Sequence, residues 1–287
     1  MQTRVGVLRG GVSEEYYNSL KTGANVLRHL PPQFEGVDIL IDRDGVWHRN
    51  GFPEEPHQII RHTDVLYNAL CGQDARLVGF IEAHNLPLIG SGSYTATLAF
   101  SRPIARQIVR KFGVLVPESI LLTEENMLGK KVSVGVIENF RGQKYYTLFP
   151  MTFTDQEFSL HTGLSQYEKE GVAEVAIKVH QLLGARHYSS SVFVVKKNGT
   201  PYFLETNTHP VLMEGSFFPL ALKQVGCSIP EFIKHTLKLA LSRGNFFGKS
   251  NSELWTVPDS NRRPPHCKCG ALPTKLTAPI AQKLRHK

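Results

Sequence analysis

The sequence lacks a long hydrophobic run and the pattern of a secretory signal. No apolar stretch approaches the roughly 18 to 20 residues that cross a bilayer. The N-terminal residues MQTRVGVLRGG have neither the apolar region nor the small-residue cleavage site of a signal peptide. We therefore expect a soluble, cytoplasmic protein with no membrane partner.

Cysteine is scarce, and the common nucleophile motifs are absent. The four cysteines are Cys71, Cys227, Cys267 and Cys269, which is no disulfide framework for 287 residues. The chain has no G-x-S-x-G, H-E-x-x-H or G-x-x-x-x-G-K-[ST] motif, so it offers no serine hydrolase, zinc protease or P-loop signature. His266 beside the two last cysteines suggests a metal site only weakly, and an unstructured segment is the favoured interpretation.

Positive charge is in excess, but it is concentrated at one end. The chain carries +8, of which +5 falls in residues 250–287, where seven Lys and Arg face two acidic residues. The rest of the chain is close to neutral. The charge therefore does not predict a nucleic-acid partner.

The first 90 residues alternate short apolar strands with helical segments. Glycines follow the first strand, and a helix extends from the acidic pair Glu14 and Glu15 to about residue 29, with Ser13 as its expected N-cap. Strands are expected at 4–8, 37–41, 64–70 and 87–90, and a further helix at 74–84. This order predicts an α/β domain with a doubly wound parallel sheet.

The pattern then changes. Residues 94–113 are helical in period, and Pro103 divides them into two helices near Ser101. Hairpins are expected at 131–138 with 144–153 and at 191–195 with 201–205, and helices at 165–183, 216–225 and 230–242. We expect three segments: an N-terminal domain at 1–93, a second domain at 94–249, and a basic, proline-containing, disordered tail at 250–287.

Three short motifs could carry chemistry. The glycine-rich turn at 10–15 and the Gly-Ser-Gly-Ser turn at 90–93 each join a strand to a helix N-terminus, where an anion can bind, although a plain turn with a capped helix explains each as well. In the motif Phe203–Pro210, Glu205 and Asn207 lie two residues apart on one strand face. A carboxylate and an amide oxygen suit Mg²⁺ that bridges nucleotide phosphates, and a solvated strand end is the alternative.

Four segments together resemble the D-alanine–D-alanine ligase family of the ATP-grasp superfamily. They are VGVLRGGVSEEYYNSLKTG, LPLIGSGSYTATLAFSRPIARQIVRKFGVLVPES, GKKVSVGVI and NGTPYFLETNTHPVLMEGSFFPLAL, in the family's order over residues 4–243. The resemblance implies a reduced ATP-grasp α+β domain after the N-terminal domain. It also implies an ATP-dependent ligase that joins two D-alanines through an acyl phosphate for peptidoglycan synthesis, with ATP and Mg²⁺ as cofactors and a homodimer as the common assembly.

The resemblance also implies roles for individual residues. Glu15 would contact the ammonium group of the first D-alanine, and Ser19, one helical turn further on, matches the serine that the family has there. Ser216 would lie near the carboxylate of the second substrate. The nucleotide would be contacted by Arg102, which stands where the family has a lysine, and by Glu124 and Glu125, and the metal by Glu205 and Asn207.

The chain departs from the family pattern at several of these places. Residues that carry the phosphate-covering loop are missing between Thr123 and Gly129. Ser190 stands where the family has an arginine, and Val192 where it has a metal-binding aspartate. We therefore expect a ligase homologue with weakened catalysis, and the alternative is a catalytically inactive homologue that still binds substrate.

Overall fold

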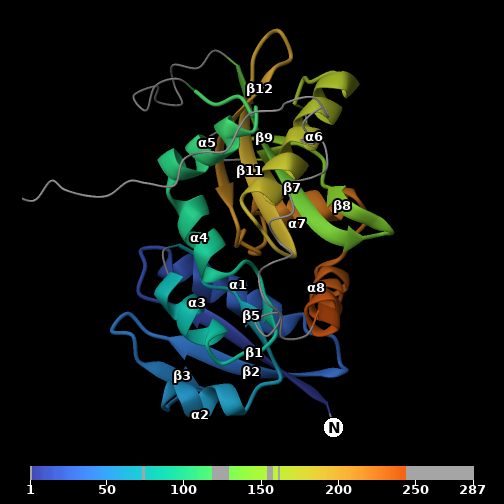
Figure 1. Cartoon of the computed structure of the whole chain (residues 1–287). Coiled ribbons are helices and arrows are strands. Elements are labelled where there is room, and N and C mark those ends of the chain that lie inside the picture. Colours follow the sequence, from blue (N-terminus) through green and yellow to red (C-terminus); the bar gives the residue numbers. More distant parts are fainter. Residues whose placement is uncertain (1, 73–74, 118–128, 154–157, 161, 244–287) are drawn as a thin grey trace, which may run out of the picture. The chain divides into compact units, whose positions relative to one another are not determined.

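The computed structural model describes residues 2–72, 75–117, 129–153, 158–160 and 162–243 (Figure 1). All of them fall in one compact unit, residues 1–247. The first half of this unit contains β1 (Thr3–Gly10), α1 (Tyr16–Arg28), β2 (Phe34–Ile41), β3 (Trp47–Arg49), β4 (Phe52–Pro53), α2 (Pro56–Arg61), β5 (Val65–Asn68), α3 (Ala75–Glu82) and β6 (Leu88–Ile89). The second half contains α4 (Ser93–Phe100), α5 (Arg102–Lys111), β7 (Lys130–Phe140), β8 (Gln143–Thr147), β9 (Met151–Phe153), β10 (Phe158–Ser159), α6 (Gln166–Leu182), β11 (Tyr188–Val195), β12 (Pro201–Asn207), α7 (Phe217–Gln224) and α8 (Ile229–Arg243).

The first sheet has the strand order β4-β3-β2-β1-β5-β6. β2, β1, β5 and β6 are parallel, and β3 and β4 extend the sheet in antiparallel fashion. The chain moves outward from β1 to β2 on one side and continues at β5 on the other. The order therefore reverses between β1 and β5, which in open α/β sheets is where ligands bind.

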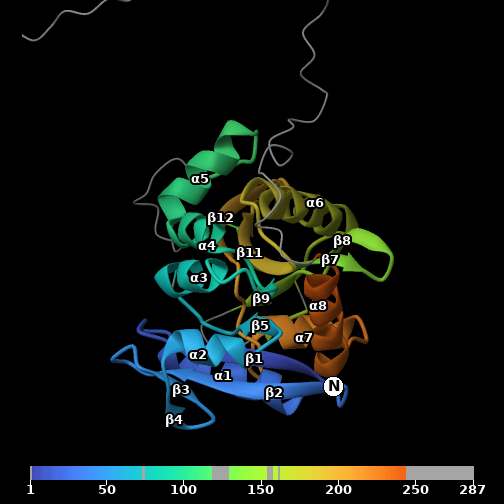
Figure 2. The same ribbon diagram turned by 60° about the horizontal axis from the view of Figure 1, so that its bottom comes forward.

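Side chains on opposite faces of these strands pack in two separate hydrophobic cores. Val5, Val7 and Tyr67 pack in a core that includes residues of α1, α7 and α8, whereas Leu8 and Ile39 pack in a core with residues of α2 and α3. The last helix thus returns to cover the first sheet beside α1 (Figure 2). The expected α/β class with a doubly wound sheet is confirmed.

The second sheet is antiparallel, with the order β10-β9-β7-β11-β12 and with β8 paired to β7. One face packs against α5 and α6 through valines of β7 and through Phe193 and Phe203. The other face includes Ile137 and Tyr188 and belongs to the core shared with α7 and α8. Because β12 forms one edge of this sheet, its side chains can meet the N-terminus of α5.

Most of the predicted elements are present. Ser101 separates α4 from α5 as Pro103 indicated, and Asn198-Gly199 turns the chain between β11 and β12. The short elements β3, β4, α2 and β10 were not predicted. The predicted tail at 250–287, with His266 and its cysteines, lies outside the described residues, and the boundary between residues 93 and 94 stays a prediction.

The predicted start of the first helix is wrong. α1 begins at Tyr16 with Glu15 as its N-cap, and its first turn contains no acidic residue. The hydroxyl of Ser13 donates to the carbonyl of Cys71 at 2.8 Å, so it does not cap the helix. The side chain that the local pattern assigned to the helix N-terminus is instead hydrogen-bonded to a loop that is distant in the sequence.

In the described part of the chain, no helix combines the length and the apolar character needed to cross a membrane.

Candidate functional site

Two loops meet where the order of the first sheet reverses. Glu15 follows β1, and Gly72 follows β5. A Cβ added to Gly72 would lie 3.3 Å from Cγ of Glu15 and 2.8 Å from the hydroxyl of Ser13. The two loops are therefore in contact, and the exposed carboxylate of Glu15 lies at the carboxyl end of the parallel strands, where a ligand is expected.

The backbone of the glycine turn is already used within the fold. The N–H of Gly11 donates to the carbonyl of Ile41 at 2.8 Å, and the N–H of Gly10 donates to the hydroxyl of Ser19 at 2.9 Å. These two groups are not offered to an anion. A carboxylate that attracts an ammonium group is thus the stronger of the two interpretations of this turn.

Ser19 is fully buried and links three elements. Its hydroxyl accepts from Gly10 and donates to the carbonyl of Ala69 at 2.9 Å, so it joins β1, α1 and the end of β5. The side chain lies one helical turn from Glu15, as predicted, because the N–H of Ser19 donates to the carbonyl of Glu15. Its observed contacts position the carboxylate-bearing helix, and a direct contact with substrate stays a prediction.

The turn at 90–93 behaves as a capped helix start. Gly90 has a φ of +110°, and the N–H and hydroxyl of Ser93 both donate to the carboxylate of Glu82, the hydroxyl at 2.5 Å. The helix N-terminus is thus already occupied by an anionic group of the protein itself.

The metal-ligand motif lies at the edge of the second sheet. In the register of β11 and β12, Ser190 pairs with Asn207 and Val192 pairs with Glu205. The two positions where the family has an arginine and an aspartate therefore lie directly opposite the two predicted ligands. The side-chain oxygen of Asn207 accepts from the N–H of His209 at 2.8 Å.

Arg102 and Glu205 form an ion pair. The Nε of Arg102 lies 2.5 Å from a carboxylate oxygen of Glu205. One turn further along α5, Nε of Arg106 donates to the carbonyl of Leu204 at 2.8 Å. The structure thus joins a predicted phosphate contact to a predicted metal ligand.

These residues do not form a convincing magnesium site. Mg²⁺ in nucleotide sites is held by one or two carboxylates together with phosphate oxygens. Here Glu205 is paired with a guanidinium, and the side chain of Val192 contains no oxygen. Across the described residues, no three His, Cys, Asp or Glu side chains are grouped so as to hold a metal ion.

The loop between β12 and α7 is fixed against α1. The N–H of Leu212 donates to the hydroxyl of Thr22 at 3.2 Å, and the side-chain amide of Asn25 donates to the carbonyl of Leu212 at 2.5 Å. At the end of this loop, the hydroxyl of Ser216 donates to the carbonyl of Met213 at 2.6 Å. The loop that connects Asn207 to Ser216 therefore lies against the helix that begins after Glu15.

Two buried histidines, not assigned a role from the sequence, enclose Gly90. The Nε2 of His209 accepts from the amide of Asn68 at 3.0 Å, and the other side of that amide accepts from the N–H of Leu70, which fixes its orientation. His187 has a φ of +63°, and its Nδ1 lies 3.2 Å from the N–H of Gly90. We call His187, Gly90 and His209 the histidine joint, since it links the two sheets.

Burial shapes the titration of this joint. Loss of solvent lowers the pKa of His187 to about 4, with a further lowering by the charge of Arg243, and it lowers the pKa of His209 to about 4. Both rings are therefore neutral at pH 7. His209 could have been noticed in the sequence as the neighbour of Asn207, but nothing local indicated its partners.

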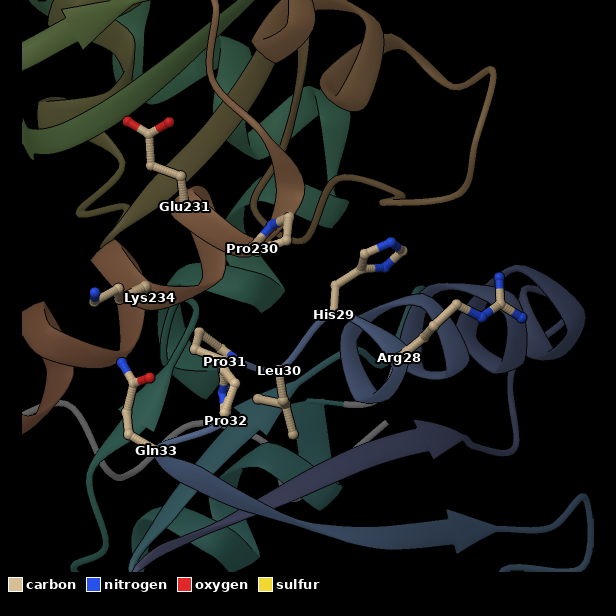
Figure 3. A pocket seen from close by; sticks show the side chains of 9 residues that line it. All are labelled: Arg28, His29, Leu30, Pro31, Pro32, Gln33, Pro230, Glu231 and Lys234. Atoms are coloured by element: carbon tan, nitrogen blue, oxygen red, sulfur yellow. The ribbon is translucent and has the colours of Figure 1, made fainter.

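A surface hollow lies at the opposite end of α1 from Glu15. It has a volume of about 490 Å³ and is lined by residues 28–33 and by Pro230, Glu231 and Lys234 (Figure 3). None of the predicted site residues lines it. The two remaining predicted nucleotide contacts, Glu124 and Glu125, lie outside the described residues.

Comparison with known proteins identifies the relatives of this fold. Residues 117–238 match the family model described as the D-Ala-D-Ala ligase C-terminus. The D-alanine–D-alanine ligase of Leptospira interrogans is 23% identical over 347 aligned positions, which cover 84% of this chain and 99% of the relative. That of Aquifex aeolicus is 24% identical, with 80% of this chain and 98% of the relative covered.

The solved structures agree in fold. The D-alanine–D-alanine ligase of Coxiella burnetii superposes with a TM-score of 0.73 at 16% identity, over 84% of this chain and 94% of that protein. The corresponding enzyme of Bacillus anthracis, solved in complex with ATP, gives a TM-score of 0.68 at 19% identity, over 84% and 97%. The chain is similar over most of its length to D-alanine–D-alanine ligases. The resemblance inferred from the sequence is thereby confirmed, as is the mixed α/β fold of an ATP-grasp ligase.

This chain lacks internal segments that the Leptospira enzyme contains. The alignment with the Leptospira enzyme covers nearly all of that enzyme and extends over 347 positions, more than the 287 residues of this chain. The relative therefore contains segments that have no counterpart here. The gap inferred from the sequence between Thr123 and Gly129 is consistent with this difference.

Proposed function

We propose that this chain is an ATP-dependent carboxylate–amine ligase that acts on D-alanine in the cytoplasm. In the reaction, a carboxylate oxygen of the first D-alanine attacks the γ-phosphorus of ATP and ADP leaves. The amine of the second D-alanine then attacks the acyl phosphate, phosphate leaves, and the amine gives up a proton. Most of the catalytic demand is on orientation and on the neutralisation of phosphate charge.

One observation carries this proposal: the contact between the β12–α7 loop and α1. Leu212 is bound by Thr22 and Asn25, so the loop that bears Asn207 and Ser216 is held against the helix that follows Glu15. The loop with the predicted metal ligand Asn207 and the predicted substrate residue Ser216 thus contacts the helix that begins after Glu15. This contact supports a site to which both sheets contribute residues.

The proposed roles follow from the positions. Glu15 would bind the ammonium group of the first D-alanine at the reversal point of the first sheet, and Ser19 would hold its helix in place. Ser216 would lie near the carboxylate of the second substrate. Arg102 would contact phosphate oxygens. The magnesium ion expected from the resemblance stays a prediction, and the described residues fit it poorly, so no step is assigned to it. A homodimer is likewise a prediction.

The test is D-alanine-dependent release of ADP from ATP by the full chain, measured both with Mg²⁺ and with EDTA. Glu15→Gln removes the charge that would bind the ammonium group and should weaken D-alanine binding about tenfold or more. Glu14→Gln is the matched control, because Glu14 is the exposed neighbouring acid. Equal effects of the two variants would contradict the assigned role of Glu15.

The outcome also separates the proposal from its alternative. ADP release that requires D-alanine supports the ligase. Binding of D-alanine by calorimetry without ADP release would instead identify an inactive homologue that retains the substrate site. Absence of both from folded protein would refute the proposal.

A further inference from the structure

The predicted metal ligand Glu205 is neutralised by the protein itself. Its carboxylate is bound by Nε of Arg102 at 2.5 Å, and Arg106, four residues along the same helix, reaches the neighbouring Leu204 carbonyl. Two guanidinium groups therefore approach this edge of β12, and that of Arg102 pairs with the carboxylate of Glu205.

This arrangement opposes a divalent cation. The cross-strand partner of Glu205 is Val192, whose side chain contains no oxygen, and the amide oxygen of Asn207 already accepts a backbone hydrogen bond. A dication bound at Glu205 would have to displace or adjoin the guanidinium of Arg102, and like charges at that range repel.

The same arrangement suits an anion. A guanidinium has five N–H donors in a planar fork that matches phosphate oxygens. Nε of Arg102 is directed to Glu205, and the side chain is 58% exposed, so further donors remain for a ligand. The ion pair with Glu205 then fixes the orientation of the Arg102 guanidinium.

We propose that the guanidinium of Arg102 takes the place of the divalent cation at Glu205, so that this site binds a nucleoside triphosphate as the metal-free anion. The inference rests on the proposed function for the identity of the anion. The exclusion of the metal, however, can be tested without any nucleotide.

The first experiment titrates Mn²⁺ alone into the full chain and follows free Mn²⁺ by electron paramagnetic resonance. The wild type and Glu205→Gln should bind the same amount of Mn²⁺, because Glu205 holds no metal ion in the wild type. The double variant R102Q/V192D, which removes the guanidinium and adds a carboxylate opposite Glu205, should gain one site. R110Q/V192D is the control, because Arg110 is an exposed arginine of the same helix. A wild-type site that Glu205→Gln abolishes would overturn the proposal.

The second experiment measures ATP binding by calorimetry in EDTA and in Mg²⁺. The wild type should bind ATP at least as tightly in EDTA as in Mg²⁺. Arg102→Gln should weaken binding in EDTA by about tenfold or more, whereas Arg110→Gln should not. Binding that requires Mg²⁺ would overturn this proposal and leave the ligase function standing. Absence of ATP binding in both buffers would refute both the metal-free site and the ligase function, even if the Mn²⁺ titration showed that the metal is excluded.

Discussion

The histidine joint predicts that the protein loses stability in mild acid. Both His187 and His209 have a pKa of about 4 in the fold, below the ordinary value of 6.5. The unfolded chain therefore binds protons that the folded chain excludes between these values. Their contribution to stability is complete above about pH 6.5 and is lost as the pH falls towards 4.

The magnitude follows from the two shifts. One pKa unit corresponds to about 1.4 kcal/mol, so each histidine can cost on the order of 3 kcal/mol at pH 4. Two such losses are comparable with the total stability of a typical domain, about 5 to 15 kcal/mol. The protein should thus be close to unfolding near pH 4.5.

Structural contacts explain why the rings cannot simply accept a proton. Protonated Nε2 of His209 would face the donor side of the Asn68 amide, and that amide cannot rotate without losing its bond from the N–H of Leu70. Among the described residues, the buried Nε2 of His187 has no hydrogen-bond partner, and the positive charge of Arg243 further disfavours the protonated ring. Glu138 opposes this effect on His187 but does not cancel it.

The assay is urea unfolding, followed by circular dichroism, at pH values from 8 to 5. The free energy of unfolding should fall steadily below about pH 6.5. His187→Asn should remove about half of the decline, since Asn tolerates the left-handed backbone at this position. His57→Asn, at an exposed site, should leave the decline unchanged. A free energy that stays constant from pH 7.5 to 5 would refute the reasoning.

Three further variants test other parts of the fold by thermal unfolding. Ser165→Ala removes the capping box of α6 and should cost about 1 kcal/mol. Gly90→Ala places a Cβ 2.8 Å from Nε2 of His209 at a φ of +110°, and a loss below about 1 kcal/mol would contradict the close packing of the joint. Glu138→Gln leaves the guanidinium of Arg243 without its carboxylate at 2.7 Å and should cost about 3 to 5 kcal/mol. The effect should be largest above pH 4.5, because burial raises the pKa of Glu138 but hydrogen bonds and nearby positive charge outweigh it and hold that pKa at about 2.

Local signals in the sequence were sufficient for most elements of the second half. Pro103 divides α4 from α5 because it cannot donate within a helix, and Asn198-Gly199 accepts the tight turn between β11 and β12. The capped start of α6 at Ser165 is equally local. These features depend on neighbours within a few residues, so a linear pattern records them.

The structural features that the sequence did not predict depend on residues that are distant along the chain. Serine is a common N-cap residue, yet the hydroxyl of Ser13 donates to the carbonyl of Cys71 instead. His209 meets Asn68 across 141 positions of the chain, and no periodicity reports such a contact. The short strands β3 and β4 contain too few residues for alternation to be recognised.

The predicted site illustrates both cases at once. The sequence supplied Glu205 and Asn207 as a pair on one strand, and the register of β12 places Val192 and Ser190 opposite them. It did not supply the contact of Arg102 with Glu205, because that contact depends on how α5 lies against the edge of the sheet. The roles of these residues in binding remain predictions.

Two substitutions that look independent in the sequence are coupled by this geometry. With Val192 in place of an acid, Glu205 is the single carboxylate of its cross-strand pair, and one guanidinium is enough to neutralise it. A second carboxylate opposite Glu205 would leave one negative charge unbalanced, and a cation would again be attracted to the strand edge. Arg102 and Val192 therefore have to be changed together to recreate a metal site. Either change alone should leave the edge without the charge that a dication requires.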